Sequence, residues 1–95
     1  MPRNKAHLLL VDDDKRILSL LSAYLRKNEF LISSARNSTE ARCLLDYFEF
    51  DLLIIDIMMP GESGLNLLES IRKQKSVPAI FLCLLDTSPS PRDPM

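Results

Sequence analysis

The sequence predicts an α/β fold built on a doubly wound parallel sheet with helices on both faces. Four short apolar runs lack polar alternation, as is typical of strands buried on both sides. The stretches between the runs repeat apolar residues at helical spacing. Since strands and helices alternate and crossovers are right-handed, few layouts remain. We expect the first strand at the centre, the second on one side, and the third and then the fourth on the other.

The first half of the chain predicts strand, helix and strand. The apolar run His7–Val11 predicts the first strand and stops at three aspartates, residues 12–14. A helix is expected next, with Asp14 as its cap and Asn28 at a left-handed C-terminal position. Phe30–Ser34 predicts a second, short strand. The residues that we expect on the inner stripe of the helix are Ile17, Leu18, Leu21, Tyr24 and Leu25.

The second half predicts two more helices and two more strands. Ser38 and Thr39 are expected to cap a helix whose inward-facing residues are Ala41, Leu44, Leu45 and Phe48. Residues 52–55 predict a third buried strand that ends at Asp56, and Ala79–Leu82 predicts a fourth. The strand cannot continue through Pro60, which lacks a backbone donor. The third helix is indicated by Leu65, Leu67, Leu68 and Ile71.

Composition limits the class of protein. The 95 residues suffice for one small domain, and a net charge of -1 supplies no field that attracts nucleic acid or an acidic membrane. No apolar stretch approaches the ~20 residues that span a bilayer. Cys43 and Cys83 have no metal-ligand spacing, so a disulfide or zinc framework is not expected. We expect a cytoplasmic protein without membrane contacts.

Acidic residues follow the two strands between which the predicted strand order reverses. Asp12 and Asp13 end the first strand and Asp56 ends the third. Ligands of such sheets bind at this switch point, beyond the carboxyl ends of the strands. Three converging carboxylates repel one another, and oxygen ligands with room for water favour Mg²⁺. A carboxylate beside Mg²⁺ can attack a phosphoryl group and hold it as an acyl phosphate.

Two motifs resemble those of the response-regulator receiver family of two-component systems. They are Leu8-Leu9-Leu10-Val11-Asp12-Asp13 and Asp56-Ile57-Met58-Met59-Pro60-Gly61-Glu62-Ser63-Gly64. The distance between them and the intervening helix, strand and helix match as well, so the resemblance covers residues 7–82. It implies a flavodoxin-like receiver fold, in which Pro60 and Gly64 shape the loop before the third helix.

The resemblance also implies roles for individual residues. Asp56 would be the phosphoacceptor and a metal ligand, and Asp13 would bind Mg²⁺ directly. Asp12 would act mainly through bound water, and Met58 would offer its backbone carbonyl to the metal. Cys83 stands at the switch position, where the family has Thr or Ser, and a thiol is a poor hydrogen-bond donor to phosphate.

The C-terminal segment differs in composition from the rest of the chain. Three of the six prolines lie in residues 83–95, which resemble the in-frame translation of a transposase adapter used in DNA sequencing. Only Asp86 departs from that adapter over residues 83–93. We therefore expect a partial receiver domain in residues 1–82 and a non-native tail in residues 83–95; the alternative is a natural disordered terminus. The family's fourth helix, fifth strand and fifth helix would have no counterpart, so Ala79–Leu82 would be the last strand.

The family also implies partners. A sensor histidine kinase would supply the phosphoryl group, and the parent protein would carry an effector, expected to be a DNA-binding transcription regulator domain, absent here. Receivers of the full-length parent could form a homodimer. The domain would not be an enzyme beyond self-phosphorylation from small donors and self-dephosphorylation.

Two alternatives stay open at this point. Phosphatases of the haloacid-dehalogenase type place Asp-x-Asp after a first strand, as Asp12 and Asp14 do, but they have Thr or Val where this chain has Arg16. A receiver-like interaction module without phosphorylation is the other alternative, and the three acids speak against it.

Overall fold

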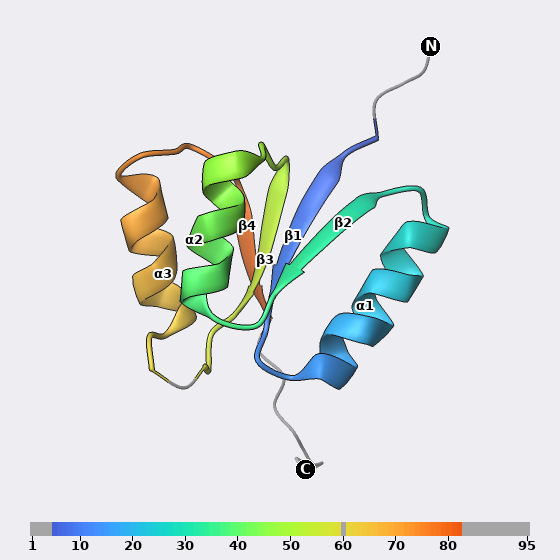
Figure 1. Ribbon diagram of the computed structural model, residues 1–95, viewed down its shortest axis with the longest axis horizontal. Helices are drawn as coiled ribbons and strands as arrows, with labels where there is room; N and C mark the ends of the chain where they lie inside the picture. The colour runs from blue at the N-terminus through green and yellow to red at the C-terminus, as the bar shows by residue number, and fades with distance from the viewer. Residues whose placement is uncertain (1–4, 60, 83–95) are drawn as a thin grey trace, which may run out of the picture.

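A computed structural model describes residues 5–59 and 61–82 of the chain (Figure 1). Strands and helices alternate through this part. The elements are β1 (His7–Val11), α1 (Lys15–Lys27), β2 (Leu31–Ala35), α2 (Ser38–Tyr47), β3 (Leu52–Asp56), α3 (Gly64–Arg72) and β4 (Ala79–Leu82). The predicted sequence of elements is confirmed, and the second strand begins and ends one residue later than predicted.

The strands form one parallel sheet in the order β2-β1-β3-β4, as predicted. Val11 pairs with Ala35 of β2 on one side and with Ile55 of β3 on the other. This register brings the residues that follow Val11 and Ile55 to the same edge of the sheet. The acids at the carboxyl ends of β1 and β3 are therefore neighbours, although more than forty residues separate them along the chain.

Helices cover the sheet on both faces: α1 lies on one side and α2 and α3 on the other (Figure 1). Successive residues of a strand point to opposite faces. Leu9 and Leu53 accordingly belong to the cluster under α2 and α3, while Leu10 and Ile54 belong to the cluster under α1. The strands are thus apolar at consecutive positions because both faces of the sheet are buried.

Two side chains predicted to face inward, Tyr24 and Phe48, lie instead at the surface, as does Leu65, one of the apolar residues that indicated the third helix. Tyr24 is 64% exposed, Phe48 48% and Leu65 52%. Phe48 follows the last residue of α2 in an extended conformation, so the helical spacing no longer applies to it. Tyr24 and Leu65 belong to neither of the two buried clusters on the faces of the sheet.

Helix ends correct two further expectations. Asn37, rather than Ser38 or Thr39, caps α2, since its side chain accepts a hydrogen bond from the Glu40 amide at 2.8 Å. At the end of α1 the left-handed residue is Glu29, with φ 70°, whereas Asn28 has φ -97°. Asp14 caps α1 as predicted. Over the residues that the structure describes, no helix is both long enough and apolar enough to cross a bilayer.

Candidate functional site

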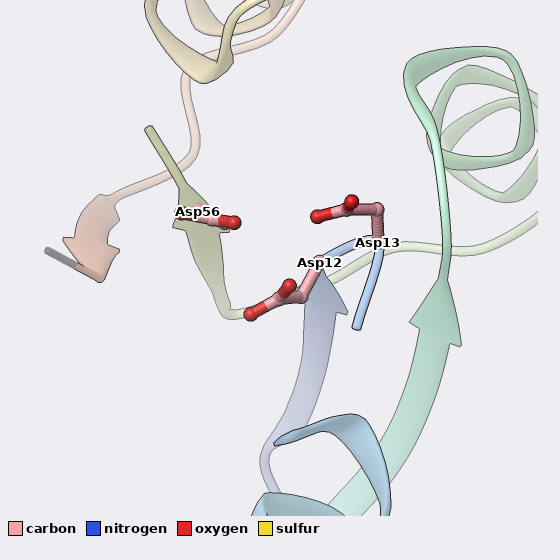
Figure 2. A group of neighbouring side chains, drawn as sticks. All are labelled: Asp12, Asp13 and Asp56. Atoms are coloured by element: carbon pink, nitrogen blue, oxygen red, sulfur yellow. The ribbon is translucent and has the colours of Figure 1, made fainter. Parts of the chain in front are cut away.

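The carboxylates of Asp12, Asp13 and Asp56 converge at the carboxyl edge of the sheet (Figure 2). One oxygen from each lies within 4.8 Å of the others. Asp12 and Asp13 follow β1 directly, and Asp56 is the last residue of β3. The parallel register of β1 and β3 therefore assembles the cluster, as the sequence predicts.

Asp12 is the buried member of the cluster, with 2% of its surface exposed. Its Oδ1 accepts a hydrogen bond from the Asp14 amide at 2.9 Å, whereas its Oδ2 is buried and has no partner among the described residues. The pKa of Asp12 is raised to about 6, chiefly by burial; the hydrogen bond from the Asp14 amide lowers it, and the negative charges of Asp56 and Asp13 raise it. A buried carboxylate oxygen without a donor, beside two more carboxylates, is suited to a cation or to a polarised water.

The donor set fits a hard divalent cation. All three groups are carboxylates, and Asp13 is exposed while Asp56 is half-buried, so water can reach the cluster. Mg²⁺ prefers oxygen ligands and keeps several waters, in contrast to Zn²⁺, which favours nitrogen and sulfur. The residues present therefore fit Mg²⁺.

Asp14 has a different role from its two neighbours. Its Oδ1 accepts a hydrogen bond from the Arg16 amide at 2.9 Å, at the start of α1. This hydrogen bond, the largest cause, lowers the pKa of Asp14. Asp14 is not among the three clustered acids. Because the Asp14 side chain caps α1 and is not one of the clustered acids, the geometry does not favour a phosphatase of the Asp-x-Asp type.

The loop after β3 packs closely around Asp56. The Met58 amide donates to Asp56 Oδ1 at 3.1 Å, while the Met58 side chain is 77% exposed. At the far end of the loop, the Gly64 amide donates to the Ile57 carbonyl at 3.1 Å. Pro60 and Cys83 lie outside the described residues, so the expectations for them stay predictions.

An ion pair that was not predicted from the sequence connects Glu62, in the loop after β3, to α2. Arg42 of α2 contacts Glu62 through both guanidinium ends: Nη1 lies 2.8 Å from Oε1, and Nη2 donates to Oε2 at 2.8 Å. Nη2 also donates to Ser70 Oγ of α3 at 2.8 Å. Hydrogen bonds from Arg42 and then Ser38 lower the pKa of Glu62, and the Glu62 carboxylate raises the pKa of Arg42.

Comparison with known proteins agrees with this geometry. The family model for the response regulator receiver domain matches residues 8–91. Protein PetR of Rhodobacter capsulatus is 44% identical over 82 residues, which cover 86% of this chain and 35% of PetR. The transcriptional regulatory protein ResD of Bacillus subtilis is 38% identical over 79 residues, 83% of this chain and 33% of ResD. The chain thus spans about a third of the length of these relatives.

Solved structures show the same fold. The response regulator TrrA of Thermotoga maritima, solved in complex with Mg²⁺-BeF, has a TM-score of 0.70 and 40% identity, and the match covers 74% of this chain and 61% of TrrA. TrrA solved in complex with the histidine kinase ThkA has a TM-score of 0.78 and 36% identity, over 90% of this chain and 75% of TrrA.

Proposed function

The chain belongs to the response regulator receiver domain family, and from this premise we propose that Asp56 accepts a phosphoryl group beside a bound Mg²⁺. The convergence of three carboxylates around the end of β3 carries the proposal. Receiver domains are phosphoacceptors, so the proposal for this chain extends to no activity beyond self-phosphorylation from small donors and self-dephosphorylation.

Each residue of the site has a distinct part in this proposal. An Asp56 carboxylate oxygen attacks the phosphorus atom, the bond from phosphorus to the donor breaks, and its electron pair leaves with the donor. The Met58 amide, 3.1 Å from Asp56 Oδ1, holds the carboxylate so that its other oxygen is free to attack. Later attack by water on the acyl phosphate would return the free carboxylate.

Asp13, Asp56 and the backbone carbonyl of Met58 would bind Mg²⁺, and Asp12 would hold one of its waters. The exposure of Asp13 and the unpartnered buried oxygen of Asp12 support this division. When bound, Mg²⁺ supplies positive charge that offsets the negative charge of the phosphoryl oxygens.

We further propose a sensor histidine kinase as the phosphoryl donor and an effector domain as the recipient of the signal. TrrA, solved with its histidine kinase, supports the first part, and ResD, a transcriptional regulatory protein, supports a DNA-binding effector. Paired receivers in a longer parent and a cytoplasmic location belong to the same proposal.

The test is phosphorylation with acetyl phosphate and Mg²⁺, followed by intact-mass spectrometry. The chain should gain one phosphoryl group that hydroxylamine removes, as expected of an acyl phosphate. Asp56→Asn should abolish the gain, while Asp46→Asn, a change to an exposed acid of α2 outside the cluster, should leave it intact. Labelling that persists in Asp56→Asn at the same peptide would contradict the assignment, and no labelling of a folded wild-type chain would favour an interaction module without phosphorylation.

A further inference from the structure

The guanidinium of Arg42 joins three separate segments of the chain. Arg42 itself lies in α2, Glu62 lies in the loop between β3 and α3, and Ser70 lies in α3. The two contacts to Glu62 join different nitrogens to different oxygens, and both are 2.8 Å long. A planar guanidinium that binds a carboxylate through two bonds fixes orientation as well as distance, which a single ammonium cannot do.

Glu62 lies in the loop that carries the site. The loop begins at Asp56, whose Oδ1 is held by the Met58 amide, and ends at Gly64, which packs against the backbone of Asp56. Between these points Gly61 has φ +82° and nothing within 4 Å of the position that its Cβ would occupy. Since packing does not restrain the loop at Gly61, the neighbouring Glu62 is well placed to restrain it through α2.

The ion pair is partly open to solvent, with 42% of the Arg42 side chain and 28% of the Glu62 side chain exposed. Pairs of this exposure contribute little to the free energy of unfolding of a whole domain. The same pair can still favour one conformation of a short loop. The two donor nitrogens of the planar guanidinium restrict where the Glu62 carboxylate can lie. Groups that orient metal ligands without touching the metal affect affinity when they are removed.

We propose that Arg42 is a positioning residue for the phosphoacceptor site, acting through Glu62. By holding Glu62 against α2, it restrains the chain that follows Asp56 and keeps the Met58 carbonyl and the Asp56 carboxylate aligned for the cation and the phosphoryl group. This inference rests on the proposed function, and the experiment below separates a failure of one from a failure of the other.

The experiment is a double-mutant cycle with Arg42→Met, Glu62→Gln and the double variant. The Kd for Mg²⁺ is measured from amide chemical shifts in ¹⁵N-labelled protein, and phosphorylation by acetyl phosphate is followed at limiting and at saturating Mg²⁺. Each single variant should raise the Kd by about three- to tenfold. The double variant should be no worse than either single one, because the two residues act as a unit. The rate should fall more at limiting than at saturating Mg²⁺.

Matched controls separate positioning from loss of charge or loss of stability. Arg72→Met removes the same charge from α3, where Arg72 has no hydrogen bond or ion pair to the described residues, and should leave the Kd within twofold. Arg42→Lys keeps the positive charge but not the planar guanidinium with its two donor nitrogens. It should therefore recover less than half of the Mg²⁺ affinity that Arg42→Met loses. If Arg42→Met melts at a much lower temperature than the wild-type chain, Arg42→Lys takes its place in the double-mutant cycle.

The proposal on Arg42 is overturned if Arg42→Lys and Glu62→Gln bind Mg²⁺ as the wild-type chain does, or if the effects of the two single variants add in full. Those results would leave the role of Asp56 intact, provided that Asp56→Asn still abolishes labelling. Labelling that survives in Asp56→Asn would instead remove the proposed function on which this inference rests.

Discussion

Gly64, the first residue of α3, packs directly against Asp56. A Cβ at Gly64 would overlap the backbone carbonyl oxygen of Asp56 and would lie 2.8 Å from Cγ2 of Ile55. Real Cβ atoms do not approach other atoms this closely, so the contact requires glycine. The start of α3 and the end of β3 are thereby held in one arrangement at the proposed phosphoacceptor.

Gly64→Ala should therefore destabilise the domain and disturb the site together. The backbone of Asp56 cannot yield as a flexible side chain can, so an overpacking cost of ~1–3 kcal/mol is expected in urea unfolding. The Kd for Mg²⁺ should rise as well. Gly61→Ala is the control, since its added Cβ meets open space and its cost arises only from φ +82°. Equal Mg²⁺ affinity in Gly64→Ala and the wild-type chain would show that the site tolerates the displacement.

Asp13 and Asp14 are adjacent acids with different predicted effects on the cation. Asp13→Ala should weaken Mg²⁺ binding by tenfold or more, since it removes an exposed carboxylate of the cluster. Asp14→Ala should change the Kd by less than twofold and lower stability by ~0.5–2 kcal/mol, because its side chain caps α1. Calorimetric Mg²⁺ titration and thermal unfolding of both variants measure the two effects. Similar losses of affinity would mean that the roles are misassigned.

The acid cluster could be predicted from the sequence because it depends on strand ends. The apolar runs indicate the residues at which β1 and β3 end. Because the two strands are parallel neighbours, Asp12 and Asp56 lie at the same edge of the sheet. The sequence could not show that Asp12 Oδ2 is buried without a donor, since this depends on how the neighbouring loops close over it.

The Arg42–Glu62 pair could not be predicted in the same way. The two residues are twenty positions apart in the sequence, so no local pattern links them. Glu62 also lies within the motif of residues 56–64, in which Pro60 and Gly64 already accounted for the shape of the loop. By contrast, the Asn37 cap had a signal: Glu40 follows three residues later and accepts a hydrogen bond from the Arg36 amide, a pattern close to a capping box. Three consecutive cap-forming residues, Asn37, Ser38 and Thr39, obscured it.

The edge strand β4 gives a prediction about self-association. In the described part of the sheet β4 pairs with β3 alone, and Ile80 is 52% exposed on the α1 face. Unprotected apolar edges pair with other chains. Ile80→Lys should lower the fraction of oligomer seen by analytical ultracentrifugation. Leu65→Lys, equally exposed at 52% but on a helix, should have a smaller effect. Equal effects would point to general surface hydrophobicity.

The pKa of Asp12 makes the stability of the metal-free protein depend on pH. Folding raises this pKa from 3.8 to about 6, chiefly by burial. Between these values the folded chain binds a proton that the unfolded chain has released, so stability falls as pH rises through the window. A rise of about two units corresponds to roughly 3 kcal/mol, which is the cost of keeping the ionised carboxylate buried above pH ~6.

Asp12→Asn should remove this cost and can keep the hydrogen bond from the Asp14 amide. In urea unfolding with EDTA, the variant should gain stability relative to the wild-type chain by up to ~3 kcal/mol between pH ~4 and pH ~7. Opposite trends from Asp14 and Glu62, whose pKa values are lowered, cancel in this difference because both chains carry them. Mg²⁺ should shrink the difference at pH ~7, since a cation compensates the wild-type carboxylates. A difference that stays flat with pH would mean that Asp12 is ionised in the folded chain at every pH tested.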